Sequence, residues 1–202
     1  MGRRIVPVTG QTVGDLPQPC RDCAFWEAGP GPRGRPGAVA QAVLKAEWVE
    51  STGTAWGPCG LLAYVDDVPA GYVMYAPPAF VPRAVAFPTS PIGPDAVLLT
   101  AAYVLPEHRG AGLGRVLVQA AAKDLTQRGV RAIEAYGAVG QACVLSPDFL
   151  ESVGFVRVRE HARNPRLRLD LRTAVTWRDP VGGALEKIRG AVRAFPAGAN
   201  RT

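Results

Sequence analysis

The sequence predicts a single α/β domain, and three observations lead to this prediction. The chain has 202 residues, 48% of them hydrophobic and 20% charged, which is typical of globular proteins and sufficient for a sizeable core. Short apolar runs typical of strands alternate with stretches whose apolar residues recur every three or four positions, as in helices. Near the middle, an apolar run ends at Pro106 and is followed by a glycine-rich turn and a helical stretch. We expect residues 1–175 to form the domain and 176–202 to be a helical extension with a tail.

The N-terminal part is expected to supply one strand and one helix. Residues 4–8 are typical of a short strand, whereas 12–37 are rich in Pro and Gly and indicate a loop over 29–37. Residues 38–50 predict a helix. The residues expected near one face of this helix are Val39, Val43, Ala46, Trp48 and Val49.

Two strands that form a hairpin are expected next, at 60–65 and 70–75. The dipeptide Asp66-Asp67 lies between them and suits a tight turn. Because side chains alternate along a strand, Tyr72 and Met74 should share one face, and Val73 and Tyr75 the other.

A long proline-rich segment separates this hairpin from the central strand. Residues 77–94 contain six prolines, which exclude a regular helix or a central strand. Long ordered loops are often functional, so the segment is either a surface elaboration or a wall or lid of a binding pocket.

The C-terminal half is expected to continue with alternating helices and strands. A helix begins at Leu113, and its buried stripe consists of Leu113, Val116, Leu117, Ala120, Ala121 and Leu125. Gly129 suits the end of that helix. The elements expected after it are a strand at 130–136, a helix at 146–153, a strand at 155–159, a strand around 167–171 and a helix at 179–194.

The glycine-rich turn is the most informative part of the chain. Residues 104–114 are Val-Leu-Pro-Glu-His-Arg-Gly-Ala-Gly-Leu-Gly. The first backbone N–H groups of a helix have no partner, and glycines let a phosphate approach them closely. A P-loop is excluded because no lysine follows Gly114, and the dinucleotide pattern fails because Arg115 or Leu117 occupies its last glycine position. The turn therefore predicts a site for a phosphate-bearing cofactor.

Two motifs carry a resemblance to a known family. Residues 104–114 match Val-x-Pro-x-x-Arg-Gly-x-Gly-x-Gly at every fixed place, and this pattern resembles the acyl-CoA loop of the GNAT superfamily of N-acetyltransferases. Residues 149–155, Phe-Leu-Glu-Ser-Val-Gly-Phe, resemble the closing helix of that superfamily, Leu-Tyr-Glu-Lys-x-Gly-Phe. The resemblance implies a mixed, mostly antiparallel sheet that is splayed around acyl-CoA, with helices on both faces. It also implies transfer of an acetyl group from acetyl-CoA to a primary amine, on a small molecule or a peptide, by direct attack in a ternary complex.

The resemblance also assigns cofactor-binding residues. They are Tyr103, Val104, Leu105, Arg109, Gly110, Ala111, Gly112, Leu113, Gly114 and Cys143. The main-chain amides of 109–114 would hold the phosphates, and a backbone N–H near Val104 and Leu105 would stabilise the oxyanion. Cys143 stands where relatives often place an Asn that touches the pantetheine arm.

Two catalytic positions depart from the superfamily pattern. Ala101 occupies the place of a frequent Glu, and Leu150 the place of a Tyr that often protonates the leaving thiolate. The candidate replacements are Tyr103, Glu134, Tyr136 and Asp95, while His108 is more typical of a solvated turn residue. Cys143 could carry an acyl group, although a small buried residue is the commoner role. These departures favour one alternative, a non-catalytic acyl-CoA-binding or scaffold protein. An acyltransferase that uses another acyl carrier is the second alternative.

The cysteines do not predict a metal centre. Cys20 and Cys23 have a spacing used in zinc and redox sites, but structural zinc usually needs two such pairs. The remaining candidates, Cys59, Cys143 and the two histidines, are isolated in the sequence. We therefore expect no metal, and no lasting disulfide in a reducing compartment.

Charge and hydropathy restrict the partners. The net charge of +6 suits an anionic cofactor such as coenzyme A. There is no dense basic run with interleaved aromatics, so nucleic acid is not an expected partner. No apolar run has the length of a membrane span or a signal peptide, and we expect a cytoplasmic protein without membrane contact. The final helix would pack on the domain or on a second copy of the chain, as in a homodimer.

Overall fold

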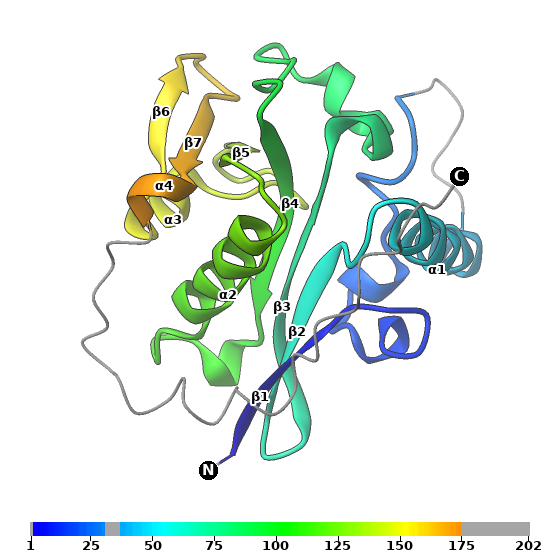
Figure 1. Ribbon diagram of the computed structural model, residues 1–202. Coiled ribbons are helices and arrows are strands. Elements are labelled where there is room, and N and C mark those ends of the chain that lie inside the picture. Colours follow the sequence, from blue (N-terminus) through cyan, green and yellow to red (C-terminus); the bar gives the residue numbers. More distant parts are fainter. Residues whose placement is uncertain (1, 31–36, 175–202) are drawn as a thin grey trace, which may run out of the picture.

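The computed structural model describes residues 2–30 and 37–174, which form one seven-stranded sheet with helices on both faces (Figure 1). The strands are Arg3–Pro7 (β1), Gly60–Val65 (β2), Val68–Ala76 (β3), Ala96–Val104 (β4), Ala132–Tyr136 (β5), Val156–Arg159 (β6) and Arg166–Asp170 (β7). The helices are Ala38–Ala55 (α1), Leu113–Gln127 (α2), Pro147–Ser152 (α3) and Leu171–Ala174 (α4). The expected helix at 179–194 and the boundary at 175 lie outside the described residues.

The sheet is mixed and mostly antiparallel, as predicted. Its strand order is β1-β2-β3-β4-β5-β7-β6. β4 and β5 are parallel, and every other neighbouring pair is antiparallel. α2 supplies the connection between the parallel strands, because parallel neighbours need a crossover.

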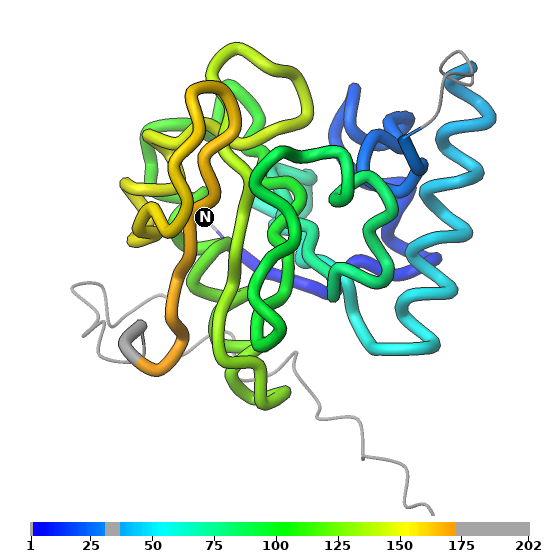
Figure 2. Tube along the Cα trace, turned by 90° about the horizontal axis from the view of Figure 1, so that it is seen from above, coloured from blue at the N-terminus to red at the C-terminus, as the bar shows by residue number. Residues whose placement is uncertain are grey.

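Separate hydrophobic clusters cover the two faces of the sheet. One face packs against α2 and α3, through residues such as Leu117 and Leu150. The other face packs against α1, the proline-rich segment and residues 8–30, which we call the N-terminal segment. Figure 2 shows α1 and the N-terminal segment together at one side of the molecule, with β6 and β7 at the other.

The hairpin between β2 and β3 follows its prediction. Asp66 and Asp67 have φ values of 48° and 65°, the left-handed backbone that a type I′ turn requires. Tyr72 and Met74 lie in the cluster beneath α1, whereas Val73 and Tyr75 pack towards α2. The alternation predicted for this strand is confirmed.

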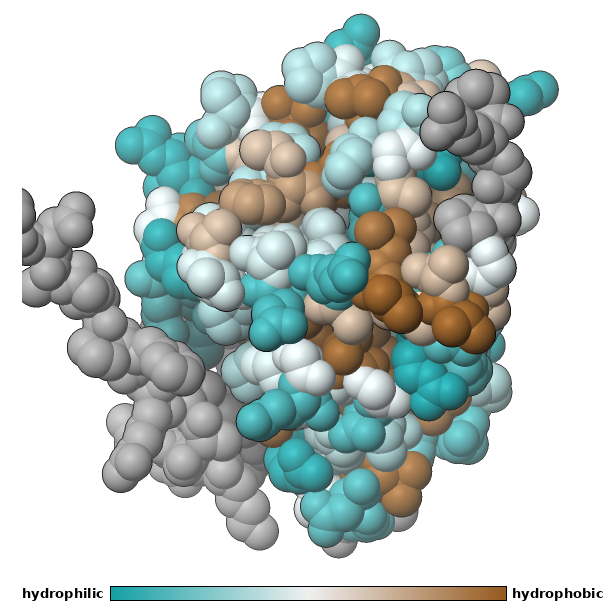
Figure 3. Space-filling view, turned by 90° about the vertical axis from the view of Figure 1, so that its right-hand side faces the viewer, coloured by the Kyte–Doolittle hydropathy of each residue, from teal (hydrophilic) through white to brown (hydrophobic). Residues whose placement is uncertain are grey.

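The buried face of α1 differs from its prediction. Gln41, Lys45, Val49 and Thr52 point inwards. Val39 and Val43 are 82% and 52% exposed, on the side of the molecule where Figure 3 shows hydrophobic residues scattered among polar ones. Polar contacts account for this difference. Lys45 Nζ lies 2.6 Å from Glu27 Oε1, and the amide of Ala24 donates to Gln41 Oε1. Contacts with the N-terminal segment, rather than apolar spacing, therefore orient this helix.

The proline-rich segment 77–94 is part of the core. It contains two short 3₁₀ helices, Pro78–Phe80 (η3) and Pro82–Ala86 (η4). Val81, Phe87 and Ile92 are buried in one cluster with Trp26 and Tyr136, and Val85 points outwards. The segment thus closes the face of the sheet that α1 leaves uncovered.

Candidate active site

The site begins where β4 and β5 part. The two strands pair only over Ala96–Leu98 and Ala132–Glu134, although β4 continues to Val104. Beyond Leu98, β4 keeps its antiparallel partner β3 on one edge and has no paired β5 residue on the other. The end of β4 therefore presents main-chain groups to an open edge.

Val104, and not Leu105, presents its N–H to this edge. The N–H of Leu105 donates to the carbonyl of Ala70 at 2.9 Å, so it is used within the sheet. Main-chain groups alternate in direction along a strand, which turns the N–H and C=O of Val104 towards the side from which β5 has departed. The expectation for Leu105 is corrected accordingly.

The loop after β4 forms an anion-binding turn at the start of α2. Gly110 and Gly112 have φ values of 77° and 76°, and Gly112 caps α2. In the described part of the chain, the N–H groups of residues 110–115 donate no backbone hydrogen bond, and the first helical bond is from Val116 to Gly112. A Cβ at either glycine would meet nothing within 4 Å. Unpaired amides, the positive helix end and open space fit a phosphate group.

A groove of about 460 Å³ joins the strand edge to this turn. Seven of the ten predicted cofactor residues line it, namely Tyr103, Val104, Arg109, Gly110, Gly112, Leu113 and Gly114. Leu105, Ala111 and Cys143 are not among its lining residues. The lining residues that the sequence analysis did not assign to the cofactor are Ala102, His108, Arg115, Phe149, Ser152 and Val153. The closing-helix motif was the available signal for the last three.

Two arginines give the groove a positive potential. Arg109 Nε donates to the Val104 carbonyl at 2.9 Å, and its guanidinium lies 5.5 Å from the centre of the Tyr103 ring. Arg115, in the first turn of α2, donates to the Ser152 carbonyl on α3. Both cations line the groove, Arg109 towards the end of β4 and Arg115 at the start of α2, which favours a polyanionic ligand.

α3 lines the groove with Phe149, an aromatic residue that has no hydroxyl group to donate a proton. Ser146 caps this helix, because its hydroxyl accepts the N–H of Phe149 at 3.2 Å. Phe149 lines the groove, and its ring lies 3.2 Å from where a Cβ on Gly114 would be. Leu150 is fully buried in the core beside α2. The place of the family's tyrosine is therefore occupied by a core residue.

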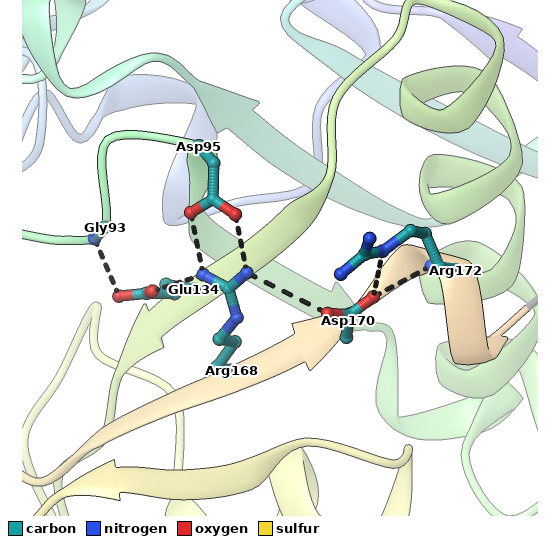
Figure 4. A network of polar contacts seen from close by, with 6 residues as sticks. All are labelled: Gly93, Asp95, Glu134, Arg168, Asp170 and Arg172. Carbon is teal, nitrogen blue, oxygen red and sulfur yellow. Dashed lines mark hydrogen bonds and ion pairs between the residues drawn. The ribbon is translucent and has the colours of Figure 1, made fainter.

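Glu134 lies in a network of ion pairs (Figure 4). It is 2% exposed, its Oε1 is 3.0 Å from Arg168 Nη1, and its Oε2 is 3.2 Å from Arg166 Nε. The amide of Gly93 also donates to it at 3.2 Å. Arg168 in turn makes two hydrogen bonds to Asp95, and these bonds hold the pKa of Asp95 below its ordinary value. The network ties the proline-rich segment to β5 and β7.

Tyr136 shares a face of the sheet with Glu134, as alternation along the strand predicts. Its ring is stacked on Phe87 at a centroid distance of 4.4 Å and lies 6.4 Å from Trp26. Burial raises the pKa of the Tyr136 phenol. Neither Tyr136 nor Glu134 lines the groove.

Cys143 lies in the loop between β5 and α3, beside the N-terminal segment. Its Sγ is 3.3 Å from Cys23 Sγ, and its carbonyl accepts the indole N–H of Trp26 at 2.8 Å. Within residues 2–30 and 37–174, no three His, Cys, Asp or Glu side chains gather closely enough to bind a metal ion. In the same part of the chain, no helix has the length and apolar character needed to cross a bilayer.

A groove that runs from the open edge of β4 to an anion-binding helix start defines a protein class that holds a phosphate-bearing ligand beside the edge of a strand. Residues 24–155 match the model of the Acetyltransferase (GNAT) family, and the chain belongs to that family. No curated protein matches it in sequence.

Solved structures share the fold at low sequence identity. The PaiA N-acetyltransferase of Thermoplasma acidophilum, in complex with coenzyme A, has a TM-score of 0.56 and 14% identity over 84% of this chain and 99% of that one. An N-acetyltransferase of Staphylococcus aureus Mu50 has a TM-score of 0.57 and 14% identity, over 85% and 99%. YncA of Salmonella typhimurium, with its cofactor acetyl-CoA, has a TM-score of 0.53 and 17% identity, over 85% and 95%. These likenesses agree with the mixed, splayed sheet.

Proposed function

We propose that this acetyltransferase moves an acetyl group from acetyl-CoA to a primary amine, by direct attack while both substrates are bound. The observation that carries the proposal is the position of the open edge of β4 directly before the anion-binding turn of α2. One end of the groove fits a polyanion and the other presents an unpaired strand N–H. Acetyl-CoA has the matching form, because its phosphates and its thioester stand at opposite ends.

The main chain does most of the binding in this proposal. The amides of residues 110–115 hold the phosphates, Arg115 adds positive charge at the start of α2, and Arg109 adds it towards the end of β4. The Val104 N–H donates to the thioester carbonyl oxygen as negative charge develops on it. A preorganised donor of this kind contributes about 3–4 kcal/mol to stabilising the transition state.

Tyr103 is the proposed proton donor to the leaving thiolate. Of the groove-lining residues, Tyr103, His108 and Ser152 carry a phenol, imidazole or hydroxyl group, and the Ser152 hydroxyl already donates to the Phe149 carbonyl at 2.7 Å. Tyr103 is on β4 next to Val104, whereas His108 lies in the turn beside the phosphate end. Glu134 and Tyr136 receive no proton-transfer role, because one is neutralised by two arginines and the other is enclosed by aromatic rings.

The amine is proposed to approach from the face that carries α1, the N-terminal segment and the proline-rich segment. The opposite face is filled by α2 and α3. No residue of 77–94 lines the groove, so this segment is available to border the acceptor. Small-molecule amines and peptide amines are both to be tested.

The test measures acetyl-CoA binding and coenzyme A release with a panel of amines, namely a polyamine, an aminoglycoside, a lysine-containing peptide and peptides with free N-termini. We expect one class to release coenzyme A and gain an acetyl group by mass spectrometry. Tyr103→Phe should lower kcat at least tenfold and leave acetyl-CoA affinity unchanged.

The buried Leu150 and the groove-lining Phe149 favour one second candidate, a protein that binds acyl-CoA without turnover. Tight binding with no release for any amine would support that candidate. If acetyl-CoA does not bind, the result would instead indicate an acyltransferase that uses another acyl carrier.

A further inference from the structure

Two cysteines that are far apart in the sequence meet on the face opposite α2. Cys23 follows the 3₁₀ turn Cys20–Asp22 (η2), and Cys143 lies 120 residues later in the β5–α3 loop. Their Sγ atoms are 3.3 Å apart. A disulfide has an S–S length of about 2.05 Å, so closure requires the sulfurs to approach by only about 1.3 Å.

The surrounding contacts hold the two thiols in this position. Trp26 donates its indole N–H to the Cys143 carbonyl at 2.8 Å, and the Ala24 amide donates to Gln41 on α1. Cys143 has a φ of 65°, a left-handed conformation that glycine adopts at lower cost. Residue 143 therefore has a backbone conformation that suits glycine, yet it is a cysteine, and its side chain contacts Cys23.

The two thiols differ in access to solvent. Cys143 is half-buried at the loop surface, and Cys23 is buried behind it. An oxidant in solution would therefore reach Cys143 first, and Cys23 stands where a resolving thiol is needed. The other two cysteines are less suited, because burial raises the pKa of the Cys20 thiol and raises that of Cys59 to about 12.

We propose that Cys23 and Cys143 form a redox-modification site, at which a peroxide converts the two thiols into a reversible intramolecular disulfide. In the first step the Cys143 sulfur attacks one peroxide oxygen, the O–O bond breaks, and a sulfenic acid and water form. In the second step Cys23 attacks that sulfur and displaces the hydroxyl group as a second water. Two thiols are oxidised, one hydrogen peroxide is reduced to two waters, and a thiol reductant reverses the product.

The disulfide would link two parts of the molecule that only side-chain contacts now join. The N-terminal segment, which is anchored on α1 through Glu27 and Ala24, would be tied to the loop that leaves β5 at the diverging strands. This inference concerns the thiols alone and does not depend on the proposed acyl transfer.

The sequence makes the linkage easy to assign. Trypsin cleaves after Arg21, between the two N-terminal cysteines, so each of the four cysteines falls on its own peptide: 5–21, 22–33, 46–83 and 132–157. The folded protein is treated with hydrogen peroxide, alkylated and digested without reductant. We expect peptides 22–33 and 132–157 to be linked, the thiol titre to fall from four to two, and dithiothreitol to restore it.

Three variants test the order of events. Cys20→Ser should form the same linkage, because Cys20 takes no part in it. Cys23→Ser should accumulate a dimedone-reactive sulfenic acid on Cys143, since its resolving thiol is missing. Cys143→Ser should leave Cys23 reduced, because that thiol is buried. A linkage of 22–33 to 5–21, or an unchanged thiol titre in both wild type and Cys20→Ser, would overturn the proposal.

Discussion

Glu134 on β5 and Arg168 on β7 are directly opposite each other in the sheet, with Oε1 and Nη1 3.0 Å apart. The same carboxylate reaches Arg166 and the Gly93 amide, so one buried side chain joins β5, β7 and the end of the proline-rich segment. This position gives Glu134 a structural role in the sheet.

Replacing Glu134 by Gln should therefore destabilise the fold. The change leaves Arg166 without its buried counter-charge, while Arg168 keeps Asp95, and breaking a buried ion pair typically costs about 3–5 kcal/mol. Urea unfolding measures this loss, with Glu160→Gln as the control, because Glu160 is 73% exposed and its ion pair is worth less than about 1 kcal/mol. Where the variant is still folded, kcat should stay close to wild type. A large loss of kcat without loss of stability would instead identify Glu134 as the base.

Asp95 should make stability depend on pH in acid. Its bonds to Arg168 lower its pKa in the folded state, whereas in the unfolded chain the pKa is about 3.9. A depressed folded pKa gives a contribution that is complete above the unfolded pKa and is lost as pH falls through the lower folded value. Wild type should therefore lose stability more steeply than Asp95→Asn below about pH 4. Equal slopes in urea midpoints at pH 7, 4 and 3 would contradict this.

Two glycines that flank α2 provide a matched pair for testing the phosphate site. Gly112 and Gly129 stand at opposite ends of the helix with φ values of 76° and 78°, and a Cβ on either meets nothing within 4 Å. An alanine at either position should cost a similar 1–2 kcal/mol or so of stability. Only Gly112→Ala should lower coenzyme A affinity, by at least tenfold in calorimetry, because its Cβ stands where the phosphate approaches. Equal affinities in the two folded variants would exclude this loop as the phosphate site.

The sequence was a good guide where structure is local. The glycines of the turn and the alternation in β3 each depend on residues within a few positions, and these predictions held. The buried face of α1 was predicted only in part: Val49 is buried as expected, but Lys45 and Gln41 are turned inwards by partners in the N-terminal segment. Apolar periodicity records hydrophobicity and contains no information on a distant polar partner.

The same limit applies to the site. Leu105 is excluded as an oxyanion donor by a hydrogen bond to Ala70 on a neighbouring strand, and the contact of Cys143 with Cys23 spans 120 residues. Both contacts depend on strand register and loop packing, which a sequence motif does not specify. The glycine motif located the groove, and the sheet decided which main-chain group faces it.

Acetyl transfer should proceed without an acyl-Cys143 intermediate. The Cys143 thiol faces Cys23, and the residue is not part of the groove lining. Intact mass spectrometry after incubation with acetyl-CoA alone should therefore show no acetyl group on Cys143. Cys143→Ser should keep kcat within about fivefold of wild type, since a nucleophile's loss costs far more. A stoichiometric adduct that disappears when the acceptor is added would establish the covalent route.

The proline-rich segment should affect the acceptor and not the cofactor. Shortening it would uncover the core, because Phe87 is stacked between Tyr136 and Trp26 at 4.4 and 5.1 Å. A single substitution is a cleaner test. Phe87→Ala removes the ring that fixes the segment on the sheet and should cost about 3–5 kcal/mol. Val85→Ala, in the same segment but 72% exposed, should stay within about 0.5 kcal/mol.

At a temperature where both variants are folded, acetyl-CoA affinity should equal that of wild type, because no residue of 77–94 lines the groove. Turnover of the acceptor should fall for Phe87→Ala and stay unchanged for Val85→Ala, because only the first loosens the segment. A rise in acceptor KM with constant acetyl-CoA affinity would place the segment at the acceptor site. Lower acetyl-CoA affinity in folded Phe87→Ala would move the segment to the cofactor side, and unchanged acceptor kinetics would make it a purely structural cover.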